Sequence, residues 1–111
     1  MRSERFNQII EERLEKCKKV LCGKAEEYAS NFDRLHNFKV AAALQGIQPI
    51  TALAGMMAKH TVSVYDLINN SEIGEEISPE MWDEKIGDHI NYLLLLTALI
   101  EEKREKECNQ A

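Results

Sequence analysis

The chain has 111 residues, of which 44% are hydrophobic and 30% charged, a balance typical of a single soluble globular domain. Its formal net charge is −5 and no basic cluster stands out, which argues against a nucleic-acid polymer as the main partner. The sequence contains no run of about 18 apolar residues, so no membrane span is predicted, and the first residues lack the apolar core of a signal peptide. Cys17, Cys22 and Cys108 form no CxxC spacing. We therefore expect reduced thiols, no zinc site and a cytoplasmic location.

The first predicted helix covers about residues 3–29. Its apolar line, at steps of three and four residues, consists of Phe6, Ile10, Leu14, Cys17, Leu21 and Tyr28, with Lys24 interrupting it between the last two. Lys24 and Glu27 bring charge to the face of Tyr28 near the end of this helix. Residues 30–33 contain capping types and predict a break.

A shorter second helix is predicted over about residues 34–45, with Gly46 as a left-handed stop. Pro49 suits the first position of a third helix, because its missing N–H would have no partner there. One face of the third helix is an apolar line that consists of Ile50, Leu53, Met57, His60, Val64 and Leu67. Lys59 and Asp66 lie on the neighbouring face. We interpret His60 as a hydrogen-bonded core residue in preference to a ligand.

A polar, acidic loop is predicted over residues 69–77, after which Ser78 caps the fourth helix and Pro79 begins it. One packing line of this helix consists of Trp82, Ile86, His89, Leu93, Leu96 and Ile100. The adjacent line consists of Lys85, Asp88, Tyr92, Leu95 and Leu99, and it places a carboxylate among residues that favour burial. Residues 101–111 form a charged tail, either a solvated helix or a frayed end.

These patterns predict an all-α fold, a four-helix bundle, in one domain over residues 1–111 with its core in about residues 3–100. Residues 93–96 are apolar on all sides, so they are expected to lie centrally or in a subunit contact. We therefore expect a homo-oligomer, a dimer or larger.

Three of the helices are expected to turn polar groups toward the interior: Lys24 with Glu27, Lys59 with Asp66, and Glu84 with Asp88. Carboxylates that converge in a bundle bind hard cations, and Mg²⁺ is usually held by one or two carboxylates plus substrate phosphates. Lysines beside such an ion contact phosphate oxygens as point charges. Buried ion pairs with a structural role explain the same spacing, and both interpretations stay open.

The segment Glu84-Lys85-Ile86-Gly87-Asp88, followed by Asn91-Tyr92 and a leucine run, resembles a signature of the all-α, MazG-like nucleoside triphosphate pyrophosphohydrolases. Lys24-Ala25-Glu26-Glu27-Tyr28 and the central Lys59 of the third helix resemble a phage-associated branch, the nucleotide-modification-associated helical domains. The resemblance covers about residues 20–100. It implies a MazG-like fold and Mg²⁺-dependent hydrolysis of a (deoxy)nucleoside triphosphate to the monophosphate and pyrophosphate.

The resemblance also assigns residues by motif. It implies catalytic roles for Glu27 and Asp88, metal ligation by Glu27, Glu84 and Asp88, phosphate contacts from Lys24, Lys59 and Lys85, and a place beside the base or sugar for Asn91 and Tyr92. The family's ExxE signature is missing at the expected interval, and Glu26 and Glu27 point about 100° apart on a helix. Two alternatives therefore stay open: a module that binds a nucleotide without hydrolysing it, and a helical protein–protein adaptor.

Overall fold

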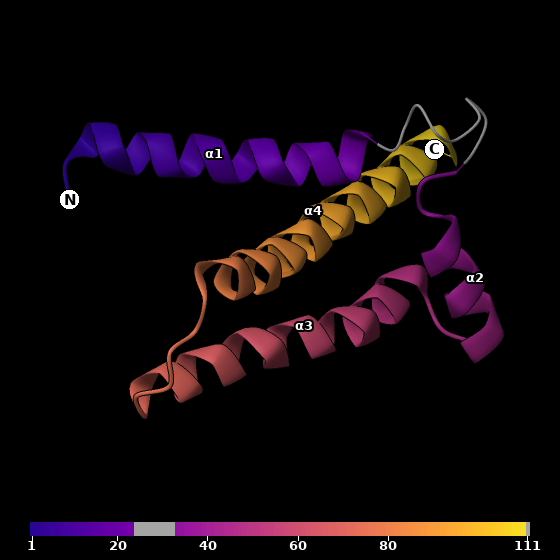
Figure 1. Cartoon of the computed structure of the whole chain (residues 1–111). Helices are drawn as coiled ribbons and strands as arrows, with labels where there is room; N and C mark the ends of the chain where they lie inside the picture. Colours follow the sequence, from indigo (N-terminus) through magenta and orange to yellow (C-terminus); the bar gives the residue numbers. More distant parts are fainter. Residues whose placement is uncertain (24–32, 111) are drawn as a thin grey trace. The chain divides into compact units, whose positions relative to one another are not determined.

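The computed structural model describes residues 1–23 and 33–110, which form four α-helices and no strand (Figure 1). In chain order these are α1 (Ser3–Cys22), α2 (His36–Gln45), α3 (Pro49–Glu72) and α4 (Pro79–Gln110). The prediction of an all-α chain with four helices, the second one short, is confirmed. The chain divides into two compact units, Met1–Phe32 and Asp33–Ala111.

The described part of the first unit is the amphipathic helix α1. Glu4 lies in its first turn and Lys19 in its last turn, where each charge is favourable with the helix dipole. Of the predicted apolar line, Phe6, Ile10 and Leu14 are exposed. The predicted helix is confirmed as far as Cys22. Residues 24–32, which include Lys24, Glu27 and most of the predicted break, lie outside the described residues.

The second unit begins with a capped turn at Asp33. The side-chain carboxylate of Asp33 accepts a hydrogen bond from the backbone N–H of Leu35 at 2.9 Å. The backbone carbonyl of Asp33 accepts one from the N–H of His36 at 3.1 Å. These bonds satisfy N–H groups that have no partner within α2. At the other end of α2, Gly46 has φ +68°, where a Cβ is unfavourable, and the predicted left-handed stop is confirmed.

The starts of α3 and α4 are also confirmed. Pro49 is the first residue of α3, and Pro79 is the first residue of α4. Ser78 caps α4, because its hydroxyl accepts a hydrogen bond from the N–H of Met81 at 3.1 Å. α4 continues to Gln110, so the described part of the charged tail is helical.

The loop between α3 and α4 is shorter than predicted. The prediction of a loop from residue 69 is wrong, because α3 continues to Glu72 and the N–H of Ile73 still donates to the carbonyl of Asn69 at 3.3 Å. The two asparagines at the start of the predicted loop are tolerated inside a helix. Ile73, the residue after the helix, has φ −89° and ψ 12°, and Gly74 follows with φ +92°.

The apolar core of the second unit lies where α2 meets the α3–α4 pair (Figure 1). It is built from Leu35, Phe38, Leu53 and Leu99, with Ile50, Met56, Met57, Tyr92, Leu95 and Leu96 packed against them. Leu53 is fully buried, which stabilises the fold by about 1.5–3 kcal/mol relative to an exposed side chain. Every residue of the apolar line predicted for α3 is buried or half-buried, which confirms that line.

On α4 the two predicted lines differ in burial. Leu99 of the Asp88 line is buried, whereas Leu93 of the other line is 46% exposed. Both lines reach the core, because Leu95 and Leu99 of the Asp88 line and Leu96 of the other line belong to it or pack against it. Taken singly, no described helix is long and apolar enough to cross a membrane; α2 and α3 meet that criterion only as a pair bent by 102°.

Candidate functional site

The interface of α3 and α4 includes a group of polar side chains next to the apolar core. His60 and Thr61 of α3 meet Asp88, His89 and Tyr92 of α4, and these five residues are called the polar seam below. The imidazole of His60 stacks on the ring of Tyr92, with 4.6 Å between centroids and 30° between planes. Its Nδ1 lies 3.9 Å from Oδ2 of Asp88. The seam is thus held by an aromatic stack beside a carboxylate.

A second polar contact crosses the seam at Thr61. Its hydroxyl oxygen lies 3.0 Å from Nε2 of His89 and 3.4 Å from the carbonyl oxygen of Met57. Because the carbonyl can only accept, the Thr61 hydroxyl donates to it, and Nε2–H of His89 then donates to the hydroxyl oxygen. This arrangement selects the Nε2-protonated tautomer of His89.

Tyr92 joins the seam to the core. Its ring also meets the ring of Phe38 edge to face, with centroids 6.3 Å apart and planes at 77°. Such pairs contribute about 0.5–1.5 kcal/mol beyond their buried area. His60 is packed in the same stack, its side chain only 18% exposed, and it meets Tyr92 by stacking and Asp88 at 3.9 Å. The prediction that it is packed is confirmed, whereas the hydrogen bond expected for it stays a prediction.

The Asp88 side chain is 41% exposed, so the carboxylate lies at the edge of the seam and keeps contact with solvent. Full burial of an ionised carboxylate without a partner would be very costly. At the edge it retains lone pairs for a cation or a hydrogen-bond donor while the rest of its helix turn packs. This is the position in which an acidic side chain can meet a bound ligand.

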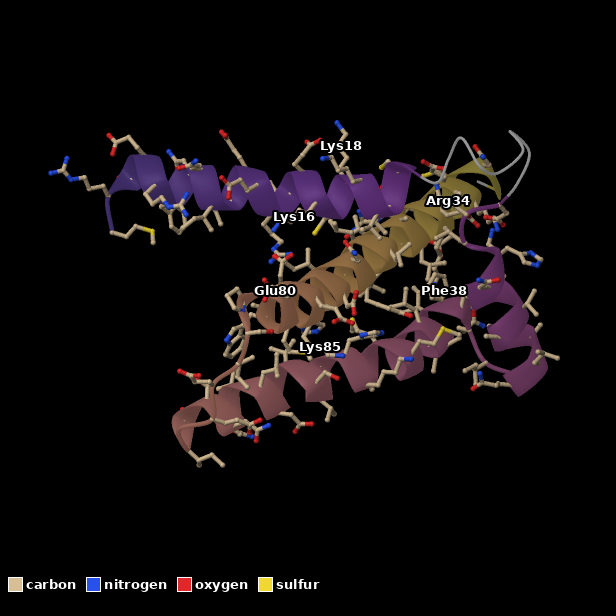
Figure 2. All side chains as sticks on the ribbon, in the orientation of Figure 1. Lys16, Lys18, Arg34, Phe38, Glu80 and Lys85 are labelled. Carbon is tan, nitrogen blue, oxygen red and sulfur yellow. The ribbon has the colours of Figure 1, made fainter. Side chains whose placement is uncertain are left out.

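Two other motif residues of α4, Lys85 and Asn91, are at least partly buried. Lys85 is half-buried, and Figure 2 shows it between α3 and α4. Asn91 is 8% exposed, and its Oδ1 has no hydrogen-bond partner among the residues that the structure describes. A buried acceptor without a partner costs about 1–3 kcal/mol. Such an atom calls for a specific explanation, and a donor from a ligand or from water would provide one.

Other predicted site residues lie on the surface. Lys59, Asp66 and Glu84 are exposed, so the expectation that they turn toward the interior is wrong. The reason is the cost of removing an unpaired charge from water, which exceeds the gain from placing these side chains against apolar neighbours. Glu84 still precedes Asp88 by one helix turn, so the two carboxylates lie on the same side of α4.

Few side chains in residues 1–23 and 33–110 lie close enough together to bind one metal ion. Within those residues, no three His, Cys, Asp or Glu side chains gather as a metal site would require. Glu84 and Asp88 nevertheless fit the chemistry of Mg²⁺, which keeps several waters and takes most of its other ligands from phosphate oxygens. Lys24 and Glu27 lie outside the described residues.

A charge network at the opposite end of the α3–α4 pair was not predicted from the sequence. The ammonium of Lys39 in α2 lies 2.5 Å from Asp33 and 2.7 Å from Glu102 of α4, and Lys106 lies 3.0 Å from the same glutamate. The Lys39 hydrogen bond lowers the pKa of Asp33 and the pKa of Glu102, and both carboxylates raise the pKa of Lys39. Glu102 and Lys106 are four residues apart on one helix, and this spacing predicts their ion pair. The ion pair of Glu102 with Lys39 joins two different helices and forms only on folding.

No protein-family model matches this chain, and neither a curated protein nor a solved structure shows significant similarity to it. Its function is therefore inferred from the geometry of these residues and from the motif resemblance.

Proposed function

We propose that the chain binds a (deoxy)nucleoside triphosphate with Mg²⁺ beside the polar seam and hydrolyses it to the monophosphate and pyrophosphate, as MazG-like pyrophosphohydrolases do. One observation carries this proposal: the motif residues Lys85, Asp88, Asn91 and Tyr92 are all buried or half-buried on α4. Polar side chains lose hydration in such positions, and a polar ligand would restore the lost interactions.

The carboxylates would hold the metal ion. Asp88 and Glu84 lie one turn apart, and Glu27 is the further ligand that the resemblance implies. The ion, when bound with the triphosphate, supplies positive charge that offsets the charge of the phosphate oxygens. The half-buried carboxylate of Asp88 would hold that ion next to the seam.

The remaining motif residues would bind the nucleotide. Lys85 lies between α3 and α4, where its ammonium would meet phosphate oxygens, and the exposed Lys59 would meet them from solvent. Lys24 is the further phosphate contact that the resemblance implies. The buried amide of Asn91 and the ring of Tyr92 would border the sugar or base. The free Oδ1 of Asn91 can accept a hydrogen bond from a ligand donor.

We also propose that the chain forms a homo-oligomer. Leu93 and Leu94 support this proposal, because these adjacent side chains of α4 are 46% and 40% exposed. An apolar pair on a helix surface is a frequent component of a subunit contact.

A second candidate is a module that binds the nucleotide and retains it. The exposure of Glu84 favours this candidate, because it leaves Asp88 as the member of that pair at the seam. A helical protein–protein adaptor is the outcome in which no nucleotide binds.

The experiment is a panel of nucleoside and deoxynucleoside triphosphates with Mg²⁺, read both by thermal shift and by pyrophosphate release. We expect one or more nucleotides to raise Tm by about 5 °C or more, since saturating ligand contributes about 3 kcal/mol. Asp88→Asn should lower pyrophosphate release about 100-fold or more, because a neutral amide is a poor Mg²⁺ ligand.

Asp66→Asn is the matched control, because it makes the same chemical change at an exposed carboxylate of α3. It should leave both readouts unchanged. A Tm shift without pyrophosphate would establish the retaining module and rule out hydrolysis. The absence of both signals across the panel would overturn nucleotide binding altogether.

A further inference from the structure

A cavity of about 480 Å³ lies at the end of the second unit where α3 begins, between α2, the first turn of α3 and the last third of α4. Its volume falls within the range of pockets that hold small organic molecules, roughly 300–1,000 Å³. None of the polar-seam residues lines it. The cavity is therefore separate from the site of the proposed nucleotide function, and its own role is independent of that function.

One part of the cavity lining is apolar. Pro49, Ile50 and Leu99 contribute to it, and Leu99 belongs to the buried core. Apolar surface of this kind gains free energy when a hydrocarbon group displaces water from it. This part of the cavity suits the apolar body of a ligand.

Another part of the lining is cationic. Lys39, Lys103 and Lys106 face two glutamates, Glu102 and Glu107, so three positive and two negative charges leave one positive charge in excess. Glu102 is already engaged by Lys39 at 2.7 Å and by Lys106 at 3.0 Å. Lys103 forms no ion pair within the described part of the chain. Its ammonium can therefore meet a ligand without breaking an ion pair between the described residues.

The start of α3 adds positive potential to the same cavity. Ile50 and Thr51 line it, and their N–H groups belong to the first turn of a 24-residue helix whose N-cap, Gln48, makes no side-chain capping bond. First-turn N–H groups have no partner inside the helix, and the helix dipole places about half a positive charge there. This effect adds to the charge of Lys103 and favours an anion at that side of the cavity.

We propose that this cavity binds a small organic anion with an apolar body, its anionic group between Lys103 and the start of α3 and its body against Ile50 and Leu99. The ligand class is a carboxylate, sulfonate or phosphate ester that carries a hydrocarbon or aromatic portion. The carboxylate of Glu107 limits the site to anions of low charge, since a multiply charged ligand would meet repulsion there.

The probe is anilinonaphthalene sulfonate, which combines one sulfonate with an aromatic body and fluoresces when it leaves water. Lys103→Glu should weaken its binding about tenfold, the effect of losing a charge-assisted contact. Lys18→Glu makes the same change of net charge at a residue that is not among those lining the cavity, and should leave the affinity unchanged. Thr51→Tyr fills the cavity from the start of α3 and should lower the number of bound probe molecules by one.

Two further measurements locate the probe and test its charge. In amide NMR spectra, the probe should shift the signals of Thr51 and Lys103 but not that of Ile73 in the distant loop. The neutral analogue phenylnaphthylamine should bind about tenfold more weakly than the sulfonate. Equal affinities for the two probes, or equal effects of Lys103→Glu and Lys18→Glu, would overturn the proposal. So would shifts confined to residues outside the cavity.

Discussion

The two ends of the α3–α4 pair differ in what holds the helices together. At the end beside α2, Leu53 and Leu99 are buried in an apolar cluster. Toward the loop at residues 73–78, the same two helices meet through an imidazole stacked on Tyr92, a threonine hydroxyl and the edge carboxylate of Asp88. The first end has the composition of a folding core, and the second has polar groups that a ligand could use.

The apolar core thus lies in a different part of the protein from the residues of the proposed function. Apolar burial contributes about 25 cal/mol per Å² without any requirement for direction, so it fixes the packing of α2, α3 and α4. Polar groups at an interface gain little unless each has its partner, and Asn91 lacks one for its Oδ1 among the described residues. The polar end therefore contributes less to folding than it could, as expected for a binding site.

The largest expected effect is at the apolar end. Leu53→Ala removes a fully buried side chain and should lower the free energy of unfolding by about 2–5 kcal/mol. Urea denaturation followed by circular dichroism measures this change. Val62→Ala, at an exposed position of the same helix, should change it by about 0.5 kcal/mol or less. A loss below about 1 kcal/mol for Leu53→Ala would show that the core is not the source of stability.

At the polar end we expect a substitution to raise the free energy of unfolding. Asn91→Leu replaces a buried amide by an apolar side chain of similar volume and should raise the free energy of unfolding by about 1 kcal/mol, because the unpaired oxygen is removed. The same variant should lose the nucleotide-induced rise in Tm. Asn69→Leu, at an exposed amide of α3, should change neither quantity. Destabilisation by Asn91→Leu would mean that the amide has a partner that the variant removes.

The smallest expected effect concerns the charge network of Lys39. Its hydrogen bond holds the pKa values of Asp33 and Glu102 below their ordinary 3.8 and 4.5, so this stabilisation is present above those values and is lost as the pH falls through the lowered ones. The pKa of Lys39 is raised, so its contribution is full below 10.5 and is lost as the pH rises through the raised value. These side chains are about a third exposed, so the network should contribute less than about 1 kcal/mol.

Lys39→Met tests this network through the pH dependence of unfolding. The free energy of unfolding of the wild type should fall more steeply between about pH 6 and pH 3 than that of the variant. Lys103→Met is the control, because Lys103 has no ion pair with the described residues, and it should keep the wild-type slope. Equal slopes for wild type and Lys39→Met would show that the acid sensitivity arises elsewhere.

Local chemistry in the sequence determined the helix boundaries of the second unit. Gly46, Pro49, Ser78 and Pro79 set stops and starts through φ angles, missing N–H groups and a hydroxyl acceptor, and each of these acts within a few residues. The recurrence of apolar residues every three or four positions likewise predicted the buried line of α3 that includes Leu53. The end of α3 was missed because Asn69 and Asn70 favour loops only weakly, and the helix continued until a residue with positive φ followed.

The tertiary structure alone decided which faces meet. The hydrophobic period predicted two adjacent apolar faces for α4. In the folded protein Leu99 of one face is buried, Leu96 of the other packs against the core, and Leu93 of that second face is exposed. The tertiary structure also placed His60 on Tyr92 and Lys39 beside Glu102, contacts between residues far apart in the chain. Of the α4 motif residues, Lys85, Asp88, Asn91 and Tyr92 are buried or half-buried and Glu84 is exposed. The exposure of Lys59 and Glu84 follows from the cost of burying a charge when no partner is packed against it.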